Sequence, residues 1–476
     1  MTQLIVIGGG IAGLSAAYYA HQKAPTAQIV LLEAGEGWGG KIATERVNFD
    51  DGQFIIEGGP DTFLATKPWG VALCKELGLG ERLHGTNPKL KNTYVLHHER
   101  LEPLPDGLAM MIPTNVAAIL KSRLVSWIGK ARMGLDFVLP KQAPDDRTRD
   151  ESLGAFVSRR LGREAYENLI EPLMSGIYAG DGDRLSLQST FPYLRDLELK
   201  YGSLARGALE MRRKMPSTPG SRSAFLTPTS GLAEIVDALV ARLQEIDLRL
   251  NSPVASLSRN AAGYRVELES GQSLEAEAVI LAAPAWAAAQ VLAGFDPELA
   301  GSLGAIPYAS TATVSLAYRQ EDLPRALDGY GYVIPRRAGR RALACTWTST
   351  KFPHRAPEGY ALIRVFVGRA GQESEIPWNE ADLLALAREE LELTLGIKSD
   401  ALVARVFMWE KAMPQYNLGH PALLKRIEAA LKQHPGLALA GNGYRGIGIP
   451  DCIHSAELAV ERVLAGESAA ERVVVS

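Results

Sequence analysis

The chain opens on the stretch Gln3-Leu-Ile-Val-Ile-Gly8-Gly9-Gly10-Ile11-Ala12-Gly13, followed by helix-forming residues up to Ala20. A short apolar, β-branched run that ends in glycines predicts a strand, a tight turn and a helix. The run Gln28-Ile-Val-Leu-Leu-Glu33 predicts a second buried strand. Two such strands joined by a helix make a parallel βαβ unit, so the first 33 residues predict an α/β fold.

The glycine spacing G-x-G-x-x-G at this turn predicts a dinucleotide site. The first glycine permits the turn, the second lets backbone approach a pyrophosphate, and the third lets helix and strand pack closely. The pyrophosphate then meets the positive end of the helix. Glu33 ends the second strand twenty residues after Gly13, as expected for a ribose 2′-hydroxyl ligand. An acidic residue there disfavours NADP; a purely structural turn is the alternative.

Two further glycine turns extend the predicted site. Gly39-Gly40-Lys41 combines bare backbone with a cation, which suits an extended cofactor, and an exposed loop is the alternative. The C-terminal segment from Gly441 to Ile453 has four glycines in eight residues before a proline and a helix. A reduced, anionic flavin is stabilised by such a helix N-terminus, whereas a surface turn is the alternative. Because no second G-x-G-x-x-G follows a strand, we expect electrons to come from the substrate.

Composition excludes several function classes. The 476 residues are 46% hydrophobic and 22% charged, with a formal net charge of -3, which predicts a folded protein of two or three domains and no nucleic-acid partner. The three cysteines are far apart, which predicts buried thiols rather than disulfides or a metal site. We expect no metal at His97-His98, because neighbours on a strand point to opposite faces.

Two segments raise the question of a membrane. The uncharged run from Ala278 to Phe295 is broken by Pro284, and we expect a buried strand followed by a helix. The segment from Ala117 to Leu135 mixes apolar and basic residues; core packing with a basic outer face is the favoured explanation, and an interfacial membrane helix is the alternative. No export signal is visible at the N-terminus, which favours the cytoplasm.

The three glycine elements resemble those of the FAD-dependent porphyrinogen oxidases of the amine oxidase superfamily. Further stretches resemble the porphyrinogen oxidase version: Gly58-Gly-Pro60-Asp61-Thr-Phe63-Leu64, Lys75-Glu-Leu-Gly-Leu79, Pro172 to Asp181, Leu185 to Leu187, Ser189 to Pro192 and Trp409 to Tyr416. The resemblance covers nearly the whole chain and is greatest to the soluble Gram-positive branch, the coproporphyrinogen III oxidases. It implies the six-electron oxidation of coproporphyrinogen III in heme biosynthesis, with oxygen as acceptor and three H2O2 formed.

The resemblance also implies the site residues. FAD contacts would be Gly8, Gly9, Gly10, Ile11, Ala12, Gly13, Glu33, Ala34, Lys41, Gly58, Gly59, Pro60, Asp61, Val254, Trp409, Ile447, Gly448 and Ile449. Gly176 and Ile177 would line the cavity near the reacting carbon, as catalytic positions whose backbone carbonyls receive protons, and Lys67 and Tyr178 would contact substrate.

The implied architecture is α/β, or α+β as a whole: a Rossmann-like FAD-binding domain, a mixed-sheet substrate domain and a helical insert. We expect FAD-binding parts at 1–88, 205–295 and 431–476, the insert lining the substrate cavity at 89–204, and the substrate-binding domain at 296–430. Protoporphyrinogen IX oxidation, an amine oxidase, a carotenoid desaturase and a non-catalytic chaperone of prenylated partners are the alternatives. Implied partners are the porphyrinogen, oxygen, weak contact with a membrane surface and transient contact with an iron-inserting enzyme, for a monomer or homodimer.

Overall fold

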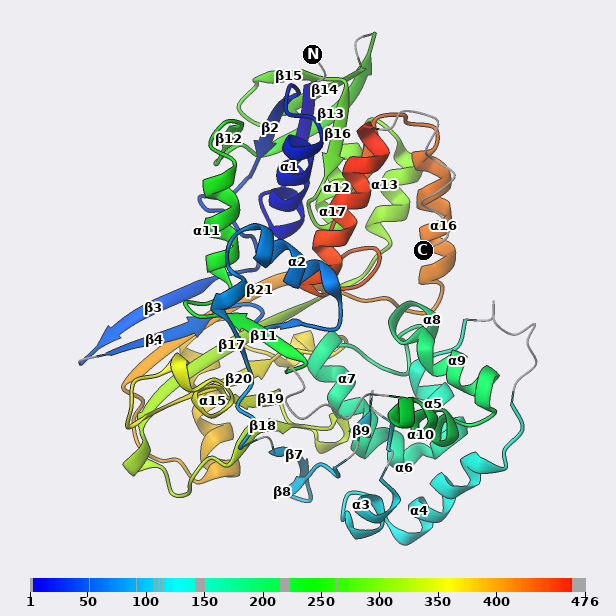
Figure 1. The fold of residues 1–476 in the computed structure, drawn as a ribbon, viewed down its shortest axis with the longest axis vertical. Helices are drawn as coiled ribbons and strands as arrows, with labels where there is room; N and C mark the ends of the chain where they lie inside the picture. The colour runs from blue at the N-terminus through cyan, green and yellow to red at the C-terminus, as the bar shows by residue number, and fades with distance from the viewer. Residues whose placement is uncertain are drawn as a thin grey trace.

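The chain folds around a five-stranded parallel sheet to which its beginning, middle and end all contribute strands. The computed structural model describes residues 3–50, 52–90, 92–106, 108–109, 112–113, 115–141, 150–214, 223–261 and 263–464. The strand order is β12-β2-β1-β16-β22, with bounds β1 Gln3–Ile7, β2 Gln28–Leu32, β12 Asp247–Arg249, β16 Ala278–Leu281 and β22 Leu437–Leu439. The predicted βαβ unit therefore supplies β1 and β2, two neighbouring parallel strands of this sheet (Figure 1).

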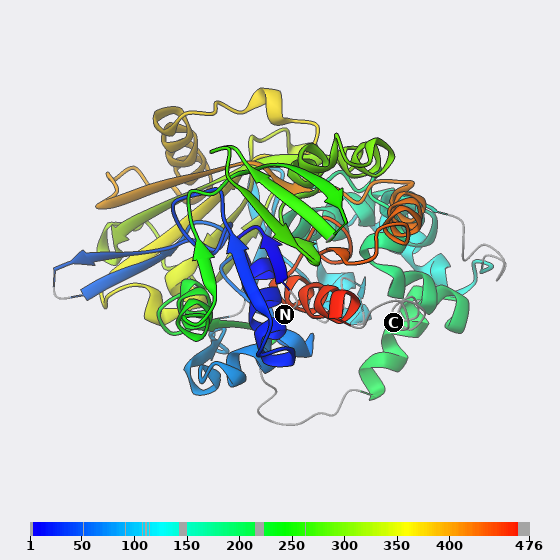
Figure 2. The same ribbon diagram turned by 90° about the horizontal axis from the view of Figure 1, so that it is seen from above.

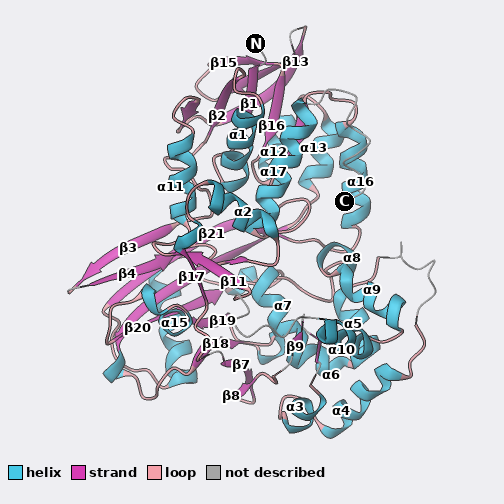
Figure 3. Ribbon diagram, viewed as in Figure 1, coloured by secondary structure: helices cyan, strands magenta, loops and turns pink. Residues whose placement is uncertain are grey.

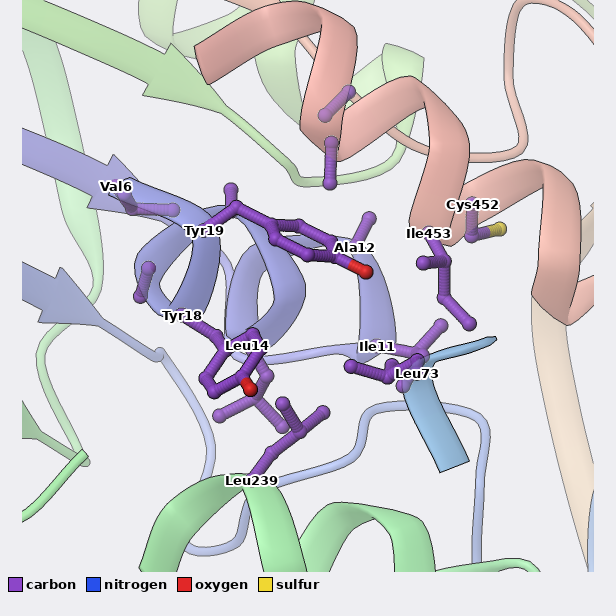
Figure 4. Packing of buried hydrophobic residues seen from close by; sticks show 14 of the residues in the cluster. Val6, Ile11, Ala12, Leu14, Tyr18, Tyr19, Leu73, Leu239, Cys452 and Ile453 are labelled. Carbon is purple, nitrogen blue, oxygen red and sulfur yellow. The ribbon is translucent and has the colours of Figure 1, made fainter. Parts of the chain in front are cut away.

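Four helices cover one face of this sheet: α1 Ile11–Lys23, α2 Pro68–Glu76, α11 Ala233–Arg242 and α17 Ile449–Leu464. Leu73 of α2, Leu239 of α11 and Ile453 of α17 converge on α1 in a common core (Figure 4). Figure 2 shows α1 and α17 side by side. The two glycine-rich ends of the chain are thus brought together by burial of apolar side chains.

The other face of the sheet is covered by a three-stranded sheet, β13 Val254–Asn260, β14 Gly263–Leu268 and β15 Ser273–Ala276, and by helices. The helices are α12 Ala285–Leu292, α13 Pro297–Gly304 and α16 His420–Leu431. β16 and α12 confirm the strand and helix predicted on either side of Pro284. Among the described residues, no helix combines the length and apolar character needed to span a bilayer.

A second, seven-stranded sheet has the strand order β21-β17-β20-β19-β18-β7-β8. Its strands are β7 Asn92–His97, β8 Arg100–Pro103, β17 Tyr308–Arg319, β18 Gly329–Val333, β19 Ala342–Trp347, β20 Tyr360–Val367 and β21 Val403–Pro414. All neighbours are antiparallel except β7 and β18, so the sheet is mixed as predicted. Helix α15 Glu380–Leu395 packs on one face, and the hairpin β3 Thr44–Phe49 and β4 Gly52–Glu57 packs on the other.

Helices dominate the region from α3 to α10 (Figure 3). Their bounds are α3 Val116–Lys121, α4 Trp127–Gly134, α5 Leu153–Leu161, α6 Arg163–Ala165, α7 Glu171–Tyr178, α8 Leu187–Thr190, α9 Pro192–Tyr201 and α10 Leu204–Lys214. Shorter elements are β5 Phe63–Leu64, β6 Leu83–Gly85, β9 Leu108–Ala109, β10 Ile112–Pro113, β11 Phe225–Pro228 and α14 Thr348–Lys351. The predicted fold class is confirmed, whereas the domain boundaries stay predictions; β7 and β8, inside the range predicted as the insert, belong to the seven-stranded sheet.

The prediction that the segment from Ala117 to Leu135 packs in the core is wrong for half of its large apolar residues. Leu124 is fully buried, but Trp127 and Ile128 expose 72% and 84% of their surface. Leu120 and Leu135 are also about half exposed, at 46% and 47%. The helical pattern correctly placed Leu120, Trp127 and Ile128 on helices, but it does not show whether another element covers them.

Candidate functional site

The first glycine turn has the geometry that the spacing predicts. Gly8 has a positive φ of 112°, and a Cβ atom at Gly13 would lie 1.7 Å from the Gly8 carbonyl oxygen. At Gly10 a Cβ atom would meet nothing closer than 4.0 Å. Gly10 is also the N-cap of α1 and brings no side chain to its free N–H groups. The turn is therefore closely packed at Gly8 and Gly13. At Gly10 it leaves open space beside the free N–H groups of a helix N-terminus, which suits a pyrophosphate.

Glu33 lies directly against this turn. One oxygen of its carboxylate accepts from the Gly9 N–H at 2.6 Å and the other from the Gly35 N–H at 2.7 Å. Ala34 follows on the surface, and Ser252, two residues before Val254, donates its N–H to the Glu33 carbonyl at 2.8 Å. The acidic end of β2 and the start of β13 are thus both placed at the turn.

The second glycine turn packs on the first one. Gly39 has a positive φ of 106° and donates its N–H to the Gly9 carbonyl at 2.8 Å. The Lys41 ammonium donates to the Ala412 carbonyl at 2.5 Å, and burial lowers the pKa of Lys41 to about 8. A cation held away from water beside two exposed-backbone turns fits an anionic cofactor.

The segment Gly58–Asp61 is held between the two sheets. The Gly58 carbonyl accepts from the Thr313 hydroxyl at 2.8 Å, the Trp409 indole N–H at 2.8 Å and the Arg364 guanidinium at 3.0 Å. A Cβ atom at Gly59 would lie 1.8 Å from the Lys41 carbonyl oxygen, so glycine is required there. Predicted FAD contacts from three separate parts of the sequence are therefore joined in one network.

Asp61 is a fixed negative charge in this segment. Its carboxylate forms an ion pair with Lys351 at 3.0 Å. Burial by itself raises the pKa of Asp61, but the charges of Lys351 and Arg364 outweigh it and lower the pKa to about 2. The side chain of Asp61 is thus engaged by protein partners, and its predicted cofactor contact is available mainly through its backbone.

The C-terminal glycine loop leads into the N-terminus of α17. Gly446 has a positive φ of 74°, and Gly448 donates its N–H to the Asp451 carboxylate at 3.1 Å. Ile449 is the first residue of this 16-residue helix, and Ile447, two residues earlier, is partly buried. α17 therefore points a second helix N-terminus, framed by bare backbone, to the region beside α1.

The structure gives Lys67 a partner that the sequence did not suggest. The Lys67 ammonium donates to both carboxylate oxygens of Asp451, at 2.6 and 2.7 Å. Asp451 in turn holds the Gly448 N–H, so Lys67 is tied to the C-terminal glycine loop. A role of Lys67 toward a substrate carboxylate stays a prediction, and it would involve sharing the ammonium with Asp451.

The helix α7 holds three of the four residues that were predicted on the substrate side, and it places them in different surroundings. Gly176 and Ile177 are exposed, Ile177 by 45%, and a Cβ atom at Gly176 would meet nothing within 4 Å. The Tyr178 ring is 5% exposed and packs edge-on against Phe191 and Tyr416, with centroids 5.6 and 6.0 Å apart. The geometry therefore leaves Gly176 and Ile177 free for contact and uses the Tyr178 side chain in the core.

Sequence reasoning missed Thr313, Lys351 and Arg364, which hold the Gly58–Asp61 segment. Thr313 and Arg364 lie in the strands β17 and β20, and Lys351 ends the short helix α14. Such residues carry no periodic or spacing signal, because their partners are more than 200 positions away in the sequence. Only the folded arrangement identifies them.

The histidine pair differs in geometry from the prediction. His97 ends β7, His98 has a positive φ of 48°, and the two rings meet edge to face at 4.2 Å rather than on opposite sides. Within the ranges that the structure describes, no group of three or more His, Cys, Asp or Glu side chains is arranged to hold a metal ion. All three cysteines are free and buried, as predicted.

Comparisons with known proteins agree with this arrangement. Residues 11–464 match the model of the flavin containing amine oxidoreductase family. The coproporphyrinogen III oxidase of Bacillus subtilis is 38% identical over 97% of both chains, and the chloroplastic protoporphyrinogen oxidase of Nicotiana tabacum is 30% identical over 95% of this chain and 83% of its own. A crystal structure from Exiguobacterium sp. 255-15, provisionally described as a protoporphyrinogen oxidase, superposes with a TM-score of 0.85 at 34% identity, over 97% of this chain and 98% of that one.

We expect Glu33→Ala to weaken the binding of a dinucleotide cofactor. The substitution removes a carboxylate that accepts from the N–H groups of Gly9 and Gly35 and that we expect to accept from a ribose hydroxyl. Each of these hydrogen bonds is charge-assisted. Loss of one or two such contacts corresponds to roughly 10- to 100-fold weaker affinity. Titration of the apoprotein with FAD, followed by quenching of flavin fluorescence, measures this. Glu36→Ala, at an exposed neighbour, is the control, and equal affinities of both variants would contradict the assignment.

Proposed function

Because this chain belongs to the flavin containing amine oxidoreductase family, and within it to the porphyrinogen oxidases, we propose that it oxidises coproporphyrinogen III to coproporphyrin III. The observation that carries the proposal is the full-length identity of 38% to a coproporphyrinogen III oxidase, higher than the 30% to a protoporphyrinogen oxidase. Its cofactor is FAD. The exposed Gly176 and Ile177 on α7 add support from the structure.

The reaction removes six electrons and six protons from the macrocycle in three two-electron steps. One porphyrinogen and three O2 give one porphyrin and three H2O2. When bound, FAD supplies the acceptor for a hydride from the substrate. The protein therefore has to place a carbon of the macrocycle, exclude water and stabilise the charge that develops.

The chain's own residues fit these tasks. The α1 N-terminus at Gly10 would bind the pyrophosphate, and Glu33 the ribose. The α17 N-terminus at Ile449 would stabilise negative charge on the flavin ring. The remaining predicted contacts, Ala34, Val254 and Gly58–Asp61 among them, would hold the cofactor between the two sheets.

On the substrate side, we propose that Gly176 and Ile177 line the cavity and that backbone carbonyls there receive protons. The absence of a side chain at Gly176 leaves room on the exposed face of α7 for the macrocycle. Lys67, shared with Asp451, is the proposed ligand of a substrate carboxylate. Protoporphyrinogen IX is the second candidate substrate, supported by the similarity to protoporphyrinogen oxidases.

We expect the purified protein to be yellow and to convert coproporphyrinogen III faster than protoporphyrinogen IX under air. Porphyrin fluorescence in parallel assays measures both rates, and a peroxide assay should give three H2O2 per porphyrin. A yellow protein that converts neither compound would overturn the proposed substrate class and leave the flavin site intact. Faster conversion of protoporphyrinogen IX would instead assign that compound as the main substrate.

We expect Gly176→Trp to abolish turnover and leave the flavin spectrum unchanged. An indole at this exposed position would occupy the space proposed for the macrocycle without disturbing buried residues. Gly176→Ala is the matched control, because its methyl group meets nothing within 4 Å and should permit turnover. Full activity of the tryptophan variant, measured by porphyrin fluorescence, would remove α7 from the cavity.

We also propose weak contact of α3 and α4 with an anionic membrane surface, for a protein that is otherwise cytoplasmic. Trp127 and Ile128 are exposed beside Lys121, Arg123 and Lys130, and the Lys130 ammonium lies 4.4 Å from the Trp127 ring. Exposed apolar groups among cations are typical of an interfacial helix. Transient docking of an iron-inserting enzyme and a monomeric or homodimeric state remain further proposals.

Sedimentation with vesicles that contain anionic lipid tests the membrane contact. We expect a fraction of the protein to sediment at low salt, and less at high salt because the basic residues are screened. The double substitution Trp127→Ser with Ile128→Ser should abolish sedimentation. Leu393→Ser, at a residue of α15 that is 55% exposed, should leave it unchanged. Absence of binding by the unsubstituted protein would retire the idea.

A further inference from the structure

Arg364 is a buried cation on the face of the seven-stranded sheet opposite α15. Along β20, Ile363, Val365 and Val367 pack into the core under α15. Arg364 alternates with them and therefore points to the other face, where its guanidinium lies 4.7 Å from the Phe366 ring. Only 2% of its surface is exposed.

The guanidinium reaches the backbone of the predicted flavin-contacting segment. One terminal nitrogen donates to the Gly58 carbonyl at 3.0 Å and to the Gly59 carbonyl at 2.5 Å. The Nε atom and the other terminal nitrogen are buried and have no hydrogen-bond partner among the described residues. An arginine has five N–H donors, and burying some of them unpaired is costly.

The neighbouring charges do not neutralise Arg364. Glu57 forms an ion pair with Arg355 at 2.9 Å, and Asp61 forms one with Lys351 at 3.0 Å. Two acids therefore face three cations, which leaves one positive charge in excess. Burial lowers the pKa of Arg364, against the opposing charges of Asp61 and Glu57, yet arginine remains protonated in proteins. The excess charge lies in a medium of low dielectric, where it acts over a longer distance than in water.

We propose that Arg364 is a positioning residue that raises the reduction potential of the bound FAD. It holds the Gly58–Gly59 backbone against the sheet and supplies the excess positive charge there. When the flavin ring gains a hydride, that is one proton and two electrons, it gains one negative charge, and a nearby cation favours that uptake. The inference rests on the proposed function in one respect only, the placement of Gly58–Asp61 against FAD.

Two substitutions separate the charge of Arg364 from its hydrogen bonds. Arg364→Lys keeps the charge, whereas Arg364→Gln keeps donors for the glycine carbonyls and removes the charge. The midpoint potential of FAD is measured in the FAD-loaded protein by reduction in the presence of a reference dye, without any porphyrinogen. We expect a shift to more negative potential in Arg364→Gln and at least half of that shift to be recovered in Arg364→Lys.

Arg369 provides a matched control. It follows β20, is 1% exposed, and also has a buried Nε and a terminal nitrogen without partners among the described residues. Its donors, however, go to the carbonyls of Ile334 and Ala342, and its nearest acid is Glu171 at 4.0 Å. Arg369→Gln should therefore lower stability without shifting the potential of FAD.

An unchanged potential in Arg364→Gln would overturn the inference, even if FAD bound more weakly, because that would mark Arg364 as structural. Equal shifts in Arg364→Gln and Arg364→Lys would overturn it as well, since the charge would then have no effect of its own. If Arg364→Gln loses FAD during purification, reconstitution with excess FAD restores the measurement. Failure of the proposed function is distinguishable, since a yellow protein that is inactive on porphyrinogens still reports its potential.

Discussion

The close approach of α1 to the first glycine turn is the constraint on which the cofactor end of the molecule depends. A Cβ atom at Gly13 would lie 1.7 Å from the Gly8 carbonyl oxygen, and one at Gly8 would lie 2.9 Å from the backbone of Ala282. The turn is thus enclosed by α1 on one side and by the residue after β16 on the other. This enclosure fixes the direction of the α1 N-terminus, and with it the place where a pyrophosphate can meet free N–H groups.

A second constraint joins the two sheets. The Gly58 carbonyl accepts from three donors that belong to β17, β20 and β21, so the seven-stranded sheet holds a segment that lies against Lys41, the residue after the second glycine turn. Lys41 reinforces the junction, because its ammonium bonds the Ala412 carbonyl of β21 and its own carbonyl leaves no room for a side chain at Gly59. The glycine turns and the seven-stranded sheet are therefore positioned by the same few contacts.

The elements that the sequence predicted well are those whose signal is local. The strands expected at the runs that begin at Gln3 and Gln28, and the strand expected before Pro284, match β1, β2 and β16, since an apolar run is read within one segment. The glycine motifs also carried real geometric information. The surroundings of single residues could not be predicted from the sequence. The structure places Tyr178 in the core and pairs Lys67 with Asp451. In the sequence, Arg364 is not distinguishable from any other polar residue of a strand. Their partners are set by long-range topology.

The ionisable side chains beside the Gly58–Asp61 segment are held as fixed charges. Asp61, with a pKa of about 2, remains ionised at any physiological pH and is already paired with Lys351. It therefore acts as a fixed counter-charge and is unsuited to accept protons from a substrate. Lys41, with its pKa lowered to about 8, is a buried cation over most of that range. Asp61 and Lys41 therefore supply fixed charges beside the glycine turns, which is the kind of stabilisation expected where an anionic cofactor binds.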